Sequence, residues 1–400
     1  MRKLLYIRED SQFFEKLLDF KGVYNIDYTN LVSIDNLSVN EKYIYVKYFQ
    51  GHVWSDMKAH LSEYDNLVWK KQKEYDIKIL YVSDNESGLT ESLNMVESII
   101  IEGGGDLNNS VLINNNRWNG KLSTSNNKIQ TNSLERIIWE GAKCVVQSNV
   151  NFDNDSKKKI FQCYNRAVNA YRTCVIVDLI KYEMVDETDW SHLRRPDYLD
   201  STNSSAGSQT PTTQYERITG NTFESIKPIY EKLVSTYPKK SEFEMDYEFE
   251  NENGVIDYNI YYQKNPYKFS YINIVNESKF DEFDTKHMHI TEKTLLPFYY
   301  FQLPLFFANS HHVKFVEENY KLDVFRDFIN HDYDLETNYQ KRYNMIFDEI
   351  KRLYKMKNEI SKFYVENRLR FEQNHEVIRE LVNLENADAN KIKKYFLNLI

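Results

Sequence analysis

The chain reads His289-Ile-Thr-Glu-Lys-Thr-Leu-Leu-Pro-Phe298 and, shortly afterwards, Leu303-Pro-Leu-Phe-Phe-Ala-Asn309. The first stretch predicts a helix start, because Thr291 has the residue type of an N-cap and Glu292 places negative charge in the first turn. The second stretch is a short apolar run, which is typical of a buried strand. Together with a strand candidate at residues 269–275, these segments predict an α/β layered domain.

The predicted helix start is also a candidate anion site. Helix N-termini present unpaired N–H groups and a partial positive charge, which suits a phosphate or diphosphate. Lys293 adds an ammonium group to the first turn, and Asn276 and Glu277 lie in a run upstream. We therefore expect Lys293 to meet phosphate groups and a nearby carboxylate to hold a sugar or ribose hydroxyl group.

Size and composition indicate two ordinary globular domains. The 400 residues are enough for two separate cores, and glycine (11) and proline (7) are scarce. The formal charge of -9 argues against unspecific nucleic-acid binding, which needs clustered Lys and Arg, but it leaves room for a local basic groove. No apolar run of about 18 residues is present, so we expect no membrane span.

The N-terminus and the cysteines predict a cytoplasmic protein, in the host cytoplasm if the protein is viral. Residues 1–10 become charged too early for a signal peptide and predict a first buried strand. Cys144, Cys163 and Cys174 lie in apolar patterns without metal-ligand spacing, so we expect reduced core residues. Abundant Tyr (31), Phe (23), Asn, Lys and Ile are typical of an AT-rich genome, as in some viruses and bacteria.

The first 150 residues alternate short apolar runs with polar or helical stretches, which predicts a largely parallel sheet. A helix is expected over residues 53–74. The strand candidates are residues 3–7, 43–48, 77–82, 98–101, 111–113 and 144–147. A polar stretch at residues 149–158 has the composition of a linker.

The α/β pattern restarts with a strand candidate at residues 159–164 and a helical run to about Val185. Residues 195–220 are rich in Ser, Thr, Asn and Gly, which predicts a mobile loop. A further strand is expected at residues 303–308, and helices are expected after Thr291 and after Ser310.

From Asn338 onward, apolar residues recur at intervals of three to four amid many charges, which predicts at least two helices with a break near Asn374. We therefore expect an N-terminal α/β domain over residues 1–155, a C-terminal α/β domain over 156–340, and C-terminal helices over 341–400.

Three segments of the second half carry a recognisable pattern. The first begins Phe161-Gln-Cys-Tyr-Asn165-Arg166 and reaches Tyr171-Arg172, the second is Ile274-Val-Asn276-Glu277-Ser278, and the third is Ile290-Thr291-Glu292-Lys293-Thr294 with Pro297. In this order they resemble a loose group of phage and bacterial glycosyltransferases that shares its C-terminal motif with the family 10 fucosyltransferases. The resemblance covers about residues 157–375. It departs from the group where Tyr171 replaces a usual His, and where Asn309-Ser310-His311-His312 replaces a Gly-rich turn.

The resemblance implies a GT-B-like fold, in which two Rossmann-like domains face a cleft and ligands bind where strands end and helices begin. It implies a metal-independent enzyme that moves a sugar from a nucleotide-sugar to a hydroxyl acceptor, with no cofactor besides that substrate. The acceptor would be a modified base in phage DNA or a surface glycan. A DNA acceptor would need a local basic cleft built from Arg117, Lys121 and their neighbours.

The expected donor site relies on cations and helix starts, which stabilise the negative charge that accumulates on a departing nucleotide phosphate. Arg166, Arg172 and Lys293 are the candidate cations, since Arg can grip two phosphate oxygens and Lys acts as a point charge. Glu277 and Glu292 would suit ribose or sugar hydroxyl groups. The full expected set is Asn165, Arg166, Arg172, Asn276, Glu277, Thr291, Glu292, Lys293 and Thr294.

A general base for the acceptor hydroxyl is expected in the first domain. Asp84 and Glu86 follow the strand candidate at residues 77–82 in a loop at its end. His52 and Asp106 are the other candidates. The glycines at residues 103–105 would either let backbone approach a ligand or form an ordinary turn.

Structural alternatives exist for these residues. Arg172 would then be an exposed helix residue and Lys293 a solvated first-turn side chain, while Asn165 and Asn276 would serve ordinary turns.

His311-His312 has no third ligand at recognisable spacing, so no metal site is predicted. The aromatic residues of 298–301, with Phe306 and Phe307, predict core positions. The alternative function is a non-catalytic α/β binding or virion-associated protein that keeps the fold.

Overall fold

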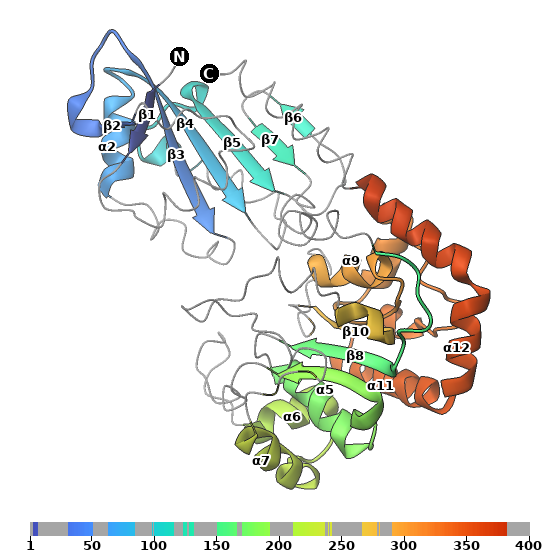
Figure 1. Cartoon of the computed structure of the whole chain (residues 1–400). Coiled ribbons are helices and arrows are strands. Elements are labelled where there is room, and N and C mark those ends of the chain that lie inside the picture. The colour runs from blue at the N-terminus through green and yellow to red at the C-terminus, as the bar shows by residue number, and fades with distance from the viewer. Residues whose placement is uncertain are drawn as a thin grey trace. The chain divides into compact units, whose positions relative to one another are not determined.

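The computed structural model describes the chain over residues 3–6, 31–50, 63–84, 98, 100–115, 123–125, 128–131, 150–165, 170–192, 211–236, 239, 241, 266–277, 280 and 290–381. The chain divides into two compact units, residues 1–135 with 383–400 and residues 136–382. Each unit is a mixed α/β structure built on a mainly parallel sheet (Figure 1).

The first unit contains a seven-stranded sheet in the order β2-β1-β3-β4-β5-β7-β6. Every neighbouring pair is parallel except β6 with β7. The strands are β1 (Lys3–Tyr6), β2 (Leu31–Ser33), β3 (Lys42–Gln50), β4 (Asp76–Asp84), β5 (Ser110–Asn115), β6 (Ser123–Ser125) and β7 (Lys128–Thr131). The strand predictions at residues 3–7, 43–48, 77–82 and 111–113 are confirmed, whereas residues 144–147 lie outside the described residues.

Helix α2 (Glu63–Lys71) covers this sheet and confirms part of the helix predicted at residues 53–74. Its Val68 and Trp69 are buried in one cluster with strand residues such as Ile77. Residues 98–101 were predicted as a strand, and this is wrong: Ser98 and residues 100–102 are helical. An apolar run this short fits a buried helical turn as well as a strand, so periodicity cannot separate the two.

The glycines at residues 103–105 form a turn against Trp69. A Cβ atom on Gly103 would lie 1.9 Å from the indole ring, and Gly104 has a positive φ of 79°. These positions need glycine for close packing and a left-handed backbone. The turn interpretation of this glycine run is therefore confirmed.

The second unit contains a four-stranded parallel sheet in the order β11-β10-β8-β9. Its strands are β8 (Lys159–Asn165), β9 (Thr188–His192), β10 (Ser270–Asn276) and β11 (Leu303–Phe307). The chain begins in the middle at β8, adds β9 on one side, and then returns to add β10 and β11 on the other. This reversal creates a topological switch point between β8 and β10.

Three of these four strands were predicted from the sequence. β9 was not, because its sequence Thr-Asp-Trp-Ser-His lacks an apolar run although its residues are mostly buried. The predicted aromatic core is confirmed, since Phe298, Phe306 and Phe307 are among the most buried side chains. Cys163 and Cys174 are buried and reduced, as predicted, while Cys144 lies outside the described residues.

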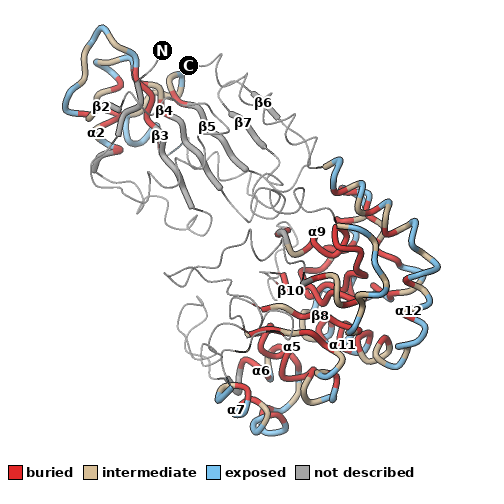
Figure 2. The backbone as a smooth tube through the Cα atoms, viewed as in Figure 1, coloured by how far each residue is buried: buried red, intermediate tan, exposed pale blue. Residues whose placement is uncertain are grey.

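Helix α5 (Ala170–Lys181) lies at the centre of this unit, and Figure 2 shows its residues buried together with those of β8 and β10. Its residues 171–179 are all buried, as expected of a helix enclosed by other elements. Further α-helices among the described residues are α6 (Pro211–Thr219), α7 (Lys227–Ser235), α9 (Glu292–Tyr299), α10 (His312–Phe315), α11 (Tyr339–Lys355), α12 (Lys357–Glu366) and a last helix over residues 368–381.

Helix α6 corrects the last part of the mobile loop that was predicted over residues 195–220, whereas residues 195–210 lie outside the described residues. Its Tyr215 is buried and donates a 2.6 Å hydrogen bond to Asp178 of α5, and Tyr343 of α11 donates a 2.8 Å bond to the same carboxylate. These two phenols join three helices. Burial raises the pKa of Asp178, and the two hydrogen bonds partly offset this effect by stabilising the charged carboxylate. A buried tertiary anchor outweighs the loop-like composition upstream of α6.

The C-terminal helices break at different places from the one predicted. α11 ends at Lys355 and α12 at Glu366, and helix continues over residues 368–381, so the break expected near Asn374 is wrong. Asn374 is buried within this last helix and bonds to both the backbone N–H and the carbonyl of Asp323, at 2.8 Å each. It therefore anchors the helix to the preceding segment.

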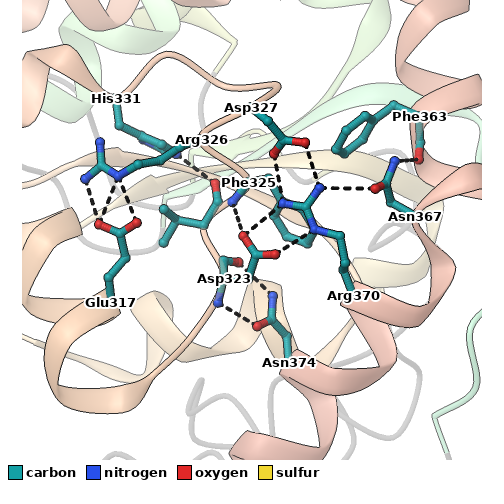
Figure 3. A network of polar contacts seen from close by, with 11 residues as sticks. Glu317, Asp323, Phe325, Arg326, Asp327, His331, Phe363, Asn367, Arg370 and Asn374 are labelled. Carbon is teal, nitrogen blue, oxygen red and sulfur yellow. Dashed lines mark hydrogen bonds and ion pairs between the residues drawn. The ribbon is translucent and has the colours of Figure 1, made fainter.

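The segment before the C-terminal helices is held by ion pairs (Figure 3). Arg370 of the last helix bonds to Asp323 at 2.7 Å and to Asp327 at 2.8 Å. Arg326 pairs with Glu317 at 2.7 Å. The pairs that Arg370 makes with Asp323 and Asp327 therefore fix the last helix on this segment.

His331 links this segment to strand β11 through Tyr333. Its Nε2 lies 2.9 Å from the Val324 carbonyl, which can only accept, so this nitrogen carries the hydrogen. Nδ1 then accepts from the Tyr333 hydroxyl at 2.8 Å, and the Tyr333 oxygen accepts from the Phe306 N–H of β11 at 3.2 Å. Burial disfavours the charged imidazole and lowers the pKa of His331 from 6.5 to about 4.

Acidification is expected to destabilise the protein through His331. Because its pKa is 6.5 when unfolded and about 4 when folded, the unfolded chain takes up the proton first, and stability is lost as pH falls through that interval. At pH 4.5 the proton uptake of His331 lowers the free energy of unfolding by about 2.5 kcal/mol. Urea unfolding at a series of pH values measures the loss.

The control variant is His331→Gln, which keeps a neutral donor for the Val324 carbonyl but does not titrate. Its unfolding free energy should fall less steeply than that of the wild type between pH 6.5 and 4.5. Equal slopes for the two proteins would contradict the assignment.

Candidate functional site

The carboxyl ends of β8 and β10 bring Asn165 and Asn276 together. The strand register pairs Gln162 with Asn273, which places the two strand-end asparagines opposite each other. Asn276 Nδ2 donates to Asn165 Oδ1 at 3.0 Å, and both side chains are buried. This pair lies at the switch point, the place where open α/β sheets bind ligands.

Cys163 supports the two asparagines from within β8. Its sulfur lies 3.2 Å from Asn276 Nδ2 and 3.5 Å from Asn165 Nδ2, so it accepts from both amides. Burial raises the pKa of the thiol to about 12. At neutral pH Cys163 is therefore protonated and is a poor nucleophile.

Glu277, directly after β10, holds the start of α9. One carboxylate oxygen accepts from the Thr291 N–H at 3.1 Å and from the Thr294 hydroxyl, and the other accepts from the Thr291 hydroxyl at 2.7 Å. The side chain is fully buried. Glu277 was expected to receive a ligand hydroxyl, but its oxygens serve the helix start, where negative charge is favourable.

Lys293 lies at the same helix start. Thr291 is the N-cap, as predicted, and its hydroxyl oxygen lies 3.4 Å from the Lys293 N–H and 3.1 Å from the Lys293 ammonium nitrogen. The ammonium is thus turned back toward the first turn of α9, and the side chain is partly exposed. The Lys293 ammonium therefore places positive charge at a partly exposed position of this helix start, which favours an anion.

Thr294 continues this chain of contacts to His312. The Thr294 hydroxyl gives its hydrogen to Glu277, so its oxygen accepts from His312 Nε2 at 3.0 Å. His312 begins α10 and is buried, which places it in a structural role. The sequence analysis named His312 only as part of a departure from the family pattern and as a histidine without a metal site, so its contact with Thr294 was not predicted.

Arg172 connects α5 to the end of β10. Its guanidinium donates to the Glu277 carbonyl at 3.0 Å and to the Tyr171 hydroxyl at 3.2 Å, and only 5% of the residue is exposed. The alternative of an exposed helix residue is therefore wrong. Tyr171, where the resembling family has a His, is buried against Phe280 with ring centroids 5.2 Å apart.

The structure thus brings together most of the expected donor-site set. Asn165, Arg172, Asn276, Glu277, Thr291, Lys293 and Thr294 surround the carboxyl ends of β8 and β10. Arg166 and the side chain of Glu292 lie outside the described residues. The site also contains Asn309, which the sequence analysis named only as a departure from the family pattern; it is buried just beyond β11.

The candidate bases of the first unit separate into two groups. Asp84 ends β4 opposite Gln50 and Asn115, at the carboxyl edge of the sheet. Asp106 precedes β5 and therefore lies at the opposite edge, where it accepts from the Asn108 N–H at 2.9 Å. It therefore does not lie beside Asp84, and its role as a general base stays a prediction. His52, Glu86 and the side chain of Asp84, with Arg117 and Lys121, lie outside the described residues.

Within the described part of the chain, no group of three His, Cys, Asp or Glu side chains is arranged to hold a metal ion. None of the helices described has both the length and the apolar character needed to cross a bilayer.

Replacing Glu277 with Ala is expected to lower the unfolding free energy by about 3 kcal/mol or more, because three buried donors at Thr291 and Thr294 lose their acceptor. Urea unfolding measures the change. Glu366→Ala, on the exposed end of α12, is the matched control and should cost less than about 0.5 kcal/mol. A loss below about 1 kcal/mol for Glu277→Ala would show that the carboxylate does not hold the helix start.

Comparison with known proteins gives no relative for this chain: no family model, no curated protein and no solved structure matches it.

Proposed function

We propose that the second unit binds the diphosphate of a nucleotide-sugar at the carboxyl ends of β8 and β10, and that the protein is a metal-independent glycosyltransferase of the GT-B type. The observation that carries the proposal is the coincidence of three features. The switch point of the sheet, the N-terminus of α9 and the Lys293 ammonium all meet beside Asn276 and Glu277.

The arrangement suits a leaving group that gains negative charge. When the bond between sugar and diphosphate breaks, the charge on the phosphate oxygens increases, and fixed positive groups lower the barrier. Lys293 is partly exposed and already oriented by Thr291, so little reorganisation is needed at the moment of reaction. The positive end of the α9 dipole lies at the same place, where Glu277 already accepts from the Thr291 N–H.

Arg172 stabilises the site through the backbone at the end of β10. By holding the Glu277 carbonyl at 3.0 Å, it fixes the end of β10 relative to α5. We assign it a positioning role rather than direct contact with phosphate, because it is almost fully buried. Arg166 and Glu292 remain candidates for direct donor contact.

The acceptor hydroxyl and its general base belong to the first unit in this proposal. Asp84, Glu86 and His52 are the candidate bases: Asp84 ends β4 at the carboxyl edge of the sheet, and in the sequence Glu86 follows β4 and His52 follows β3. A modified base in phage DNA and a surface glycan are the two acceptor classes proposed.

A donor screen tests the proposal directly. The protein is incubated with UDP-, GDP- and CMP-sugars, and release of the nucleotide is measured together with the shift in melting temperature. Turnover of at least one donor is expected. No release and no thermal stabilisation by any nucleotide would contradict the proposal, since a ligand of the native state must raise its stability.

Lys293→Ala is expected to lower the rate of nucleotide release at least about tenfold while leaving the melting temperature nearly unchanged, as expected for the loss of one charge contact in the transition state. Lys341→Ala removes an exposed lysine from α11 and serves as the control. Equal rates for both variants would exclude a role for Lys293 in the reaction.

A further inference from the structure

Asn276 has a buried oxygen with no hydrogen-bond partner. Its amide nitrogen donates to Asn165 Oδ1 and Cys163 Sγ, whereas its Oδ1 has none, although the residue is only 2% exposed. The contact with Asn165 Oδ1 fixes the orientation of the amide, because turning it over would oppose two oxygens.

Asn309 repeats this feature on the neighbouring strand. It lies just beyond β11, is 5% exposed, and its Oδ1 also lacks a partner. β11 pairs with β10, and the Glu277 N–H bonds to the Phe307 carbonyl at 3.0 Å, so both asparagines lie at the same carboxyl edge. Two unpaired acceptors therefore flank the residue that holds α9.

Buried polar atoms are nearly always paired, and an exception calls for a specific cause. These two exceptions are acceptors, so their missing partner is a donor. A phosphate oxygen does not meet this requirement, because it carries no hydrogen at neutral pH and would be repelled. Sugar hydroxyl groups meet it, and a nucleotide-sugar carries them on both sides of its diphosphate.

We propose that Asn276 Oδ1 and Asn309 Oδ1 accept hydrogen bonds from the sugar hydroxyl groups of the nucleotide ligand. The inference rests on the proposed function and names the residues that select the ligand. Glu277 was expected to take this task, but its carboxylate oxygens are occupied by Thr291 and Thr294. The asparagines thus discriminate ligands by hydroxyl content, while Lys293 binds the phosphates.

The test uses UDP, GDP, ADP and CDP as probes, with affinities measured by calorimetry on the full chain. The diphosphate that binds most tightly is then compared with its 2′,3′-dideoxy analogue and with its sugar conjugate. The first comparison reports on ribose hydroxyls and the second on the hydroxyls of the transferred sugar. The wild type should prefer the hydroxyl-bearing member of at least one pair by about fivefold to tenfold.

Asn276→Leu replaces the unpaired oxygen with an apolar group of similar size. It should reduce that preference to less than about twofold while leaving affinity for the hydroxyl-deficient member unchanged. Asn309→Leu should weaken the same preference. If Asn276→Leu does not fold, the result for Asn309→Leu tests the inference alone.

Asn273→Leu is the matched control. Asn273 lies on the same strand and is also buried, but it donates to the Gln302 side chain at 2.9 Å. This variant should lose stability and keep the wild-type preference. If Asn276 had only a structural role, Asn276→Leu would behave like Asn273→Leu: it would lose stability and keep the wild-type preference for hydroxyl groups.

The outcomes are distinguishable. If a diphosphate binds but neither Asn276→Leu nor Asn309→Leu alters the hydroxyl preference, this inference is overturned and the proposed function stands. If no diphosphate or sugar conjugate binds the wild type, both fall together. Loss of the preference in the asparagine variants, with its retention in Asn273→Leu, supports the inference.

Discussion

The candidate site of the second unit depends on one buried carboxylate, Glu277, having hydrogen-bond donors. Glu277 is fully buried at the end of β10, and a charge in that position is tolerated only if donors surround it. Thr291 and Thr294 provide these donors, so the start of α9 is fixed to the end of the strand. Lys293 and the helix N–H groups take their positions as a result, which makes the candidate anion site a consequence of how Glu277 is buried.

The sequence predicted the parts of this arrangement that have local signals. Parallel strands such as β8 and β10 are short apolar runs, and Thr291 is a recognisable N-cap. The residues gathered at the strand ends were expected because a parallel sheet places the carboxyl ends of its strands along one edge. GT-B architecture and transferase activity stay proposals, since neither follows from these local patterns.

Other features had no local signal. β9 is polar in sequence and is a strand because of its neighbours, and α6 is helical because Tyr215 reaches a carboxylate on α5. The task of Glu277 was missed for the same reason, since its donors lie 14 and 17 residues further along the chain. Only three-dimensional contacts reveal whether a carboxylate is available to a ligand or already engaged.

The order of strands in the second unit has a kinetic consequence. The contact between Asn165 and Asn276 joins positions 111 residues apart. β8 can therefore pair with β10 only after a long stretch of intervening chain has been synthesised or folded back. Closing a loop of that size is entropically costly and slow compared with forming a helix. During synthesis, the contacts between the ends of β8 and β10 cannot form until β10 has left the ribosome.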